Sequence, residues 1–290
     1  MTMKHERTLL PTAGLLLELG KRVDQLLAQR LPRLEQWRGD LQAHARGWNG
    51  AALERALLAH LAALAELDFS LLVAPGLRAG PLERHEAVFR RQASAVADCT
   101  QVTWGCVKDF VDYCARETVA AEALVSDFVM EARAIQRKAA EARLALGAVL
   151  ADVQAREADA GEVTRAGLAG LALKAVSLQQ RVAAIEDLCA TSHRVQGTTY
   201  QIREERAALV GSLRQLAQRL GGGLLDRLRP LVGPSHGLPS DDLARAADER
   251  WRLQLDLEAV LSQLARVLEL HAALAGALDA MGEKVRRSGA

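Results

Sequence analysis

The stretch FRRQASAVADCTQVTWGCVKDF, residues 89–110, places small or apolar residues at alternating steps of three and four. This spacing puts them all on one face of an α-helix, because a helix completes a turn every 3.6 residues. The pattern continues to Val153, through about nine heptads, with one charged position at Glu117. The sequence therefore predicts one very long helix with a buried seam. The seam residues are Phe89, Ala93, Val96, Thr100, Thr103, Val107, Phe110, Cys114, Ala121, Leu124, Phe128, Ala132, Ile135, Ala139, Ala142, Leu146, Val149 and Val153.

Proline positions delimit the predicted helices. The chain has no proline between Pro81 and Pro230, and none after Pro239. A proline inside a helix costs about 3 kcal/mol, so proline-free tracts of this length favour long helices. A second seam runs from Leu168 to Leu220, and a third from Leu253 to Val285. We expect helices over 12–45, 51–72, 82–158, 162–220 and 240–287.

These helices predict an all-α fold, an elongated helical bundle built on a very long antiparallel coiled-coil hairpin. No segment alternates β-branched residues in the manner of a strand, and aromatic residues make up only 3% of the chain. The expected domains are N-terminal helices over 1–81, the hairpin over 82–222 with its tip near 159, and a loop over 223–239. A C-terminal helix over 240–290 is expected to return to the bundle.

The composition offers little support for catalysis or for nucleic-acid binding. Basic and acidic residues nearly balance, at 37 and 36, so no electrostatic attraction to nucleic acid is expected. The four cysteines form no close pair and are interpreted as small apolar residues of a reducing compartment. The segment HEAVF, residues 85–89, lacks the second histidine of the zinc-protease motif. We predict no enzyme activity, no metal and no cofactor.

Two uncharged stretches flank the predicted tip: LALGAVLA, residues 144–151, and AGLAGLAL, residues 166–173. Gly147 and Gly170 fall at matching heights on the two arms, so small residues are expected to let the arms approach closely. Each stretch covers only about 12 Å of helix, against a hydrocarbon core of about 30 Å. Any membrane role would therefore be joint, tip-first and oligomeric. The candidate contacts to a membrane or a partner are Leu144, Leu146, Gly147, Val149, Leu150, Leu168, Gly170, Leu171 and Leu173.

The middle of the hairpin is polar where a seam would be apolar. Arg203 and Arg206 are expected to face residues 112–120, where either could pair with Asp112 or Glu117. One interpretation is a polar layer that fixes the register of a long coiled coil. The other is a bistable zone where the hairpin can rearrange. His271, in the third seam, is interpreted as a buried core histidine.

Three classes of function fit this architecture. The first is a non-catalytic interaction and assembly protein that binds protein partners through its helical faces, as a homo- or hetero-oligomer. The second is a membrane-acting helical protein. The third is a helical signalling bundle, which would need an input domain or a membrane anchor. The expected compartment is the cytoplasm, or the exterior after export without a classical signal peptide.

The second class includes a protein family with a similar layout of helices. The predicted layout resembles that of α-helical pore-forming toxins of the cytolysin A and haemolysin BL type. It has a short N-terminal helical region, a long hairpin over 82–220 with the two uncharged stretches at its tip, and a returning C-terminal helix. The resemblance covers most of the chain at the level of architecture. It implies a soluble bundle that releases an apolar head to insert and oligomerise. Residues 144–151 and 166–173 would belong to that head.

Overall fold

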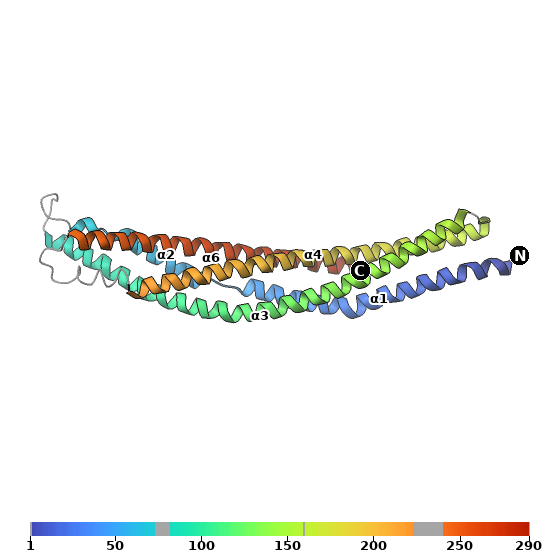
Figure 1. Ribbon diagram of the computed structural model, residues 1–290, viewed down its shortest axis with the longest axis horizontal. Coiled ribbons are helices and arrows are strands. Elements are labelled where there is room, and N and C mark those ends of the chain that lie inside the picture. The colour runs from blue at the N-terminus through green and yellow to red at the C-terminus, as the bar shows by residue number, and fades with distance from the viewer. Residues whose placement is uncertain (1, 73–81, 159, 223–239, 290) are drawn as a thin grey trace. The chain divides into compact units, whose positions relative to one another are not determined.

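The computed structural model describes residues 2–72, 82–158, 160–222 and 240–289, and within these ranges every regular element is a helix (Figure 1). The all-α prediction is confirmed. The predicted turn at Asp159 and the predicted loop over 223–239 lie outside the described residues. The elements are α1 (Thr2–Gly47), α2 (Ala51–Glu66), the 3-10 helix η1 (Phe69–Leu72), α3 (Leu82–Ala158), α4 (Glu162–Gly222) and α6 (Ser240–Gly289).

The long helices match their predicted spans closely, and α1 differs most. It begins at Thr2 rather than at residue 12, and it continues through both Pro11 and Pro32. A proline removes its own N–H from the hydrogen-bond ladder and its ring crowds the carbonyl of residue i−4, so the helix persists where packing offsets that cost. Leu31 and Leu34, which flank Pro32, are both buried.

The second helix is shorter than the predicted span 51–72, because α2 ends at Glu66. The Asp68 carboxylate accepts a hydrogen bond from the Ser70 backbone N–H at 2.8 Å. Aspartate favours this local bond because its short side chain reaches the backbone two residues on. The bond starts the separate 3-10 turn η1.

The described chain divides into two compact units, each assembled from distant segments. Unit 1 comprises Met1–Arg46, Ala121–Tyr200 and Ala272–Ala290, and unit 2 comprises Gly47–Ala120 and Gln201–His271. Each unit therefore takes part of α3, part of α4 and part of α6.

In unit 1, ion pairs connect α1, α3, α4 and α6. The contacts between α3 and α4 run in opposite order along the chain, because Arg143 pairs with Glu186 whereas Arg133, earlier on α3, bonds to Gln196, later on α4. Two antiparallel helices give this order. The other connections are Arg30–Glu131 between α1 and α3, Arg181–Asp24 between α4 and α1, and Lys284–Asp187 between α6 and α4.

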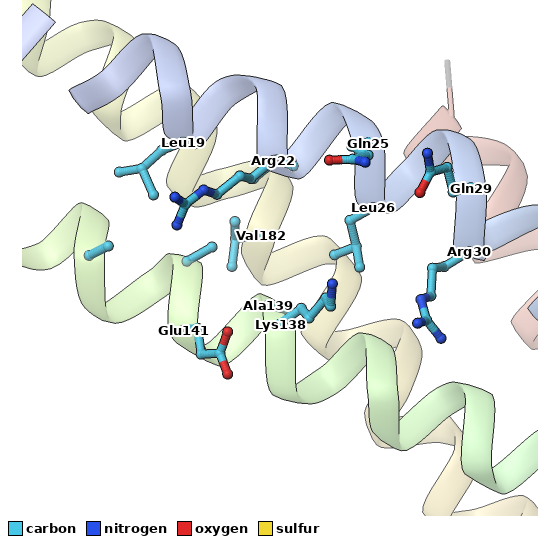
Figure 2. Close-up of a pocket in the computed structure, with 13 residues that line it drawn as sticks. Leu19, Arg22, Gln25, Leu26, Gln29, Arg30, Lys138, Ala139, Glu141 and Val182 are labelled. Carbon is cyan, nitrogen blue, oxygen red and sulfur yellow. The ribbon is translucent and has the colours of Figure 1, made fainter. Parts of the chain in front are cut away.

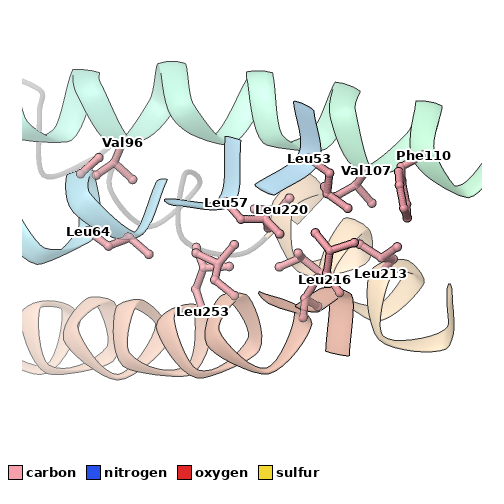
Figure 3. Packing of buried hydrophobic residues seen from close by; sticks show 14 of the residues in the cluster. Leu53, Leu57, Leu64, Val96, Val107, Phe110, Leu213, Leu216, Leu220 and Leu253 are labelled. Atoms are coloured by element: carbon pink, nitrogen blue, oxygen red, sulfur yellow. The ribbon is translucent and has the colours of Figure 1, made fainter. Parts of the chain in front are cut away.

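In unit 2, leucine-rich faces of α2, α4 and α6 and a face of α3 with Phe89, Val96, Val107 and Phe110 enclose one hydrophobic core (Figure 3). α2 contributes Leu57 and Leu64, which are fully buried, and α4 contributes Leu213 and Leu216. Leu253 of α6 lies against the same cluster. Burial of a leucine side chain contributes roughly 1.5–3 kcal/mol, so this core is a main source of the unit's stability.

Candidate interaction surface

The candidate tip residues separate into core and surface. On α3, Leu146 and Val149 are buried, and on α4 Leu168 is buried. Leu150 and Leu171 are half-buried. The side chains available to a partner are therefore Leu144, which is 73% exposed, and Leu173, which is 72% exposed.

Gly147 and Gly170, the glycines expected at matching heights, do not bring helices together. Gly147 and Gly170 are both exposed, and a Cβ built on either one would meet no atom within 4 Å. The expected close approach at these positions is wrong. The inward positions of the two helices carry larger residues, Leu146 and Leu168, so the glycines lie on the outer face.

The outer face of α3 carries a stripe of exposed residues at heptad spacing, which we call the outer stripe. Its large apolar members are Met130, 61% exposed, and Leu144, two heptads further along. Residues seven apart differ by only about 20° around a helix, so neighbouring members of the stripe lie on one face. All of its members are exposed. They are Ala123, Met130, Arg137, Leu144 and Ala151.

The polar zone of α4 is built around a buried arginine. Arg206 is 5% exposed, and its Nη2 donates to the Cys114 carbonyl oxygen of α3 at 2.9 Å. The same carbonyl accepts the Thr118 hydroxyl at 2.7 Å. The expected partners of Arg206 were Asp112, which is exposed, and Glu117. The hydrogen bond seen here goes to the main chain instead.

Arg203 and Cys114 are the other residues of this zone, and they differ in burial. Arg203 is exposed and lies outside the core. Burial raises the pKa of the Cys114 thiol, and the Glu117 carboxylate raises it further, whereas the Arg206 guanidinium lowers it. A thiol with a raised pKa is a poor nucleophile, because the thiolate is the reactive form.

An aromatic cluster lies beside Arg206. Trp48 stacks on His271 with ring centroids 4.7 Å apart and an interplanar angle of 7°. The Phe110 and Trp48 rings are nearly perpendicular, with centroids 5.4 Å apart, and the Arg206 guanidinium lies 5.9 Å from the Trp48 ring centroid. Tyr113 completes the cluster. His271 was expected in the core, but no sequence spacing indicates that it stacks on Trp48.

A hollow of about 380 Å³ lies between α1 and α3 in unit 1 (Figure 2). Its floor includes Ala139, Ala142 and Ala145 of α3, and these small side chains leave the gap. Both arginines that line it pair with carboxylates, Arg22 with Glu18 and Arg30 with Glu131. We attribute the hollow to the alanines and assign it no ligand.

The described part of the chain holds no group of three or more His, Cys, Asp or Glu side chains that could bind a metal ion. All four cysteines are free, and Cys114 and Cys189 are buried. Burial raises the pKa of the Cys189 thiol to about 12. Such buried cysteines act as small apolar residues.

Among the described helices, none combines the length and the apolar character needed to cross a membrane. The outer stripe exposes the large apolar side chains of Met130 and Leu144 at heptad spacing. The chain matches no protein-family model, no curated protein and no solved structure, so the inference of function rests on its own residues.

Proposed function

We propose that this protein is a non-catalytic helical interaction and assembly protein that binds partner helices through its outer coiled-coil faces. Its framework in this proposal is a long antiparallel coiled-coil hairpin over 82–222. The lengths of α3 and α4, 77 and 61 residues, support that framework. The opposite order of the α3–α4 contacts in unit 1 supports it as well.

The observation that carries the proposal is the exposure of Met130 and Leu144 on one face of α3. Single exposed apolar residues are common on protein surfaces and need no explanation. Two large ones at the same heptad position, with small residues Ala123 and Ala151 further along the stripe, form the pattern by which a helix packs on another helix. Charged Arg133 and Glu141 flank the stripe and would form the polar rim of an interface.

The test compares the assembly state of the wild type with that of the double variant Met130→Glu/Leu144→Glu. Sedimentation velocity over a range of protein concentrations should reveal association in the wild type and its loss in the double variant. Leu173→Glu is the matched control, because Leu173 is as exposed as Leu144 but lies on α4. Association that survives the double variant would contradict the outer stripe as the interaction surface.

A second candidate function is a soluble subunit of an α-helical pore-forming system, whose tip over 144–173 engages a membrane or partner subunits. The exposure of Leu144 and Leu173 in the two uncharged stretches favours it. Leu144 and Leu173 can be replaced by a charged residue because their side chains are exposed. Leu146 is fully buried, so a charge there would unfold the helix.

The test is dye release from vesicles of mixed zwitterionic and anionic phospholipid. Leu144→Asp and Leu173→Asp should abolish release. Val119→Asp, at an equally exposed position of α3 outside the two stretches, should leave it unchanged. Absence of release by the wild type at every lipid composition would remove this candidate.

A further inference from the structure

We propose that the outer stripe of α3 pairs with the same stripe of a second copy of this chain, antiparallel and centred on Arg137. This pairing rests on the proposed function and names its partner. The stripe reads Ala123, Met130, Arg137, Leu144, Ala151, so it has the same character in both directions from Arg137. A two-fold symmetric interface requires this kind of self-complementary surface.

The antiparallel register brings unlike large side chains together. Met130 and Leu144 lie seven residues before and seven after Arg137. Met130 of one copy therefore lies opposite Leu144 of the other, and each dimer contains this contact twice. Ala123 lies opposite Ala151 in the same way, and these small residues let the two helices approach at both ends of the stripe.

The flanks of the stripe are complementary in volume. Arg133 and Ala140 lie on one side of it, and Ala134 and Glu141 lie on the other. In an antiparallel helix pair each flank meets the same flank of the other helix. Arg133 thus faces the small Ala140 of the second copy, and Glu141 faces its Ala134, so no flank position brings two large side chains into collision.

The centre of the pair carries a repulsive contact. The two Arg137 side chains meet at the two-fold axis. Their like charges repel each other and weaken the association. Glu141 lies one helical turn further on each helix and supplies a counter-charge. With only two Met–Leu contacts and this repulsion, the dimer is weak and dependent on concentration. Arg137→Leu should tighten it at least tenfold, because it removes the repulsion and adds an apolar layer.

Cysteine cross-linking tests the register directly. The background carries Cys99→Ser and Cys106→Ser, because these two native cysteines are half-buried, whereas Cys114 and Cys189 are buried. Under mild oxidation Arg137→Cys should form a disulfide-linked dimer, because its two copies meet on the axis within reach of a disulfide. Met130→Cys alone and Leu144→Cys alone should stay monomeric, whereas an equal mixture of the two should cross-link.

The controls distinguish this pairing from the alternatives. Leu173→Cys, as exposed as Leu144 but on α4, should not cross-link. Self-cross-linking of both Met130→Cys and Leu144→Cys would indicate a parallel pair and overturn the proposal. Failure of Arg137→Cys to cross-link, while Met130→Glu/Leu144→Glu still abolishes association, would overturn the antiparallel register and leave the interaction function standing. A wild type that stays monomeric at all concentrations would overturn the pairing itself.

Discussion

The Trp48 indole lies flat on the His271 imidazole, with 4.7 Å between ring centroids, and so joins the turn before α2 to the third seam on α6. Both side chains are buried. The contact fixes the path of the chain where α1 gives way to α2, because Trp48 also meets Phe110 of α3. One residue thereby holds three segments of unit 2 together.

Loss of this side chain should be costly. Trp48→Ala removes a buried aromatic ring and leaves a cavity, so we expect the free energy of unfolding to fall by about 3–5 kcal/mol. Trp251→Ala is the control, because Trp251 is 59% exposed and should change stability by no more than about 0.5 kcal/mol. Urea unfolding followed by circular dichroism measures both. Equal losses in the two variants would refute a structural role for the stack.

The buried His60 of α2 should make the stability depend on pH. Burial lowers its pKa to about 4. The Thr100 hydroxyl donates its single hydrogen to the Val96 carbonyl at 2.7 Å, so the His60 Nε2–H must donate to the Thr100 oxygen at 3.2 Å. Nδ1 is buried without a hydrogen-bond partner. Protonation would place an unsatisfied N–H and a charge in the core.

The direction of the effect follows from proton linkage. The unfolded chain binds a proton on this histidine near pH 6.5, and the folded chain binds it only near pH 4. The stabilisation is therefore full above pH 6.5 and declines as the pH falls from 6.5 to 4, by about 3 kcal/mol. His60→Leu should flatten this part of the stability curve, whereas a change at the exposed His193, such as His193→Gln, should not. Parallel curves for His60→Leu and the wild type would contradict the assignment.

The glycines of the candidate tip should tolerate a side chain. Gly147 and Gly170 are exposed helix-interior positions with open space around a built Cβ. Gly147→Ala and Gly170→Ala should each stabilise the protein by about 0.5–1 kcal/mol, because alanine loses less backbone entropy than glycine. Gly50→Ala should instead destabilise it by about 1–3 kcal/mol, because its Cβ would lie 2.8 Å from the Leu264 Cδ1. Thermal unfolding compares the three, and destabilisation by the first two would restore the close-approach interpretation.

The seam of α3 could be predicted from the sequence because one-face periodicity is a local property. Phe89, Phe128, Leu146 and Val153 all have no exposed surface, as the spacing indicated. The start of α1 could not be predicted in the same way. The helix continues through Pro11, where the local rule that a proline ends a helix predicts a break.

α4 shows the limit of a single-seam interpretation. Arg203, assigned to its seam, is exposed, and its neighbour Ile202 is buried. α4 packs against α3 and also against α6, through contacts such as Arg266–Glu205, so its buried face is wider than one stripe. A second apolar series at heptad spacing was the signal for this. Its members are Leu188, Val195, Ile202, Leu209 and Leu216.

The same limit applied to the candidate site. The sequence identified Leu144 and Leu173, but it could not separate them from the buried Leu146 and Leu168, because all four lie in uncharged stretches. Only the direction of each side chain around its helix makes that distinction. The outer stripe was missed for the same reason, since Met130 lies at none of the predicted seam positions.

Arg206 offers the sharpest test of the polar zone. The Arg206 Nε is buried without a hydrogen-bond partner. The Cys114 carbonyl oxygen accepts a hydrogen bond from Arg206 Nη2 and a second one from the Thr118 hydroxyl. Loss of the guanidinium therefore leaves that acceptor satisfied, while the buried charge is relieved. Arg206→Met, which retains an unbranched apolar stem, should leave the protein at least as stable as the wild type.

Arg206→Ala separates packing from charge at the same position. It removes the stem as well, so we expect a loss of about 2–4 kcal/mol from the cavity against Trp48. The two variants are compared by urea unfolding at pH 7. If Arg206→Met lost as much stability as Arg206→Ala, the hydrogen bond to the Cys114 carbonyl would be the stabilising element. The register of α4 against α3 would then depend on the charge at residue 206.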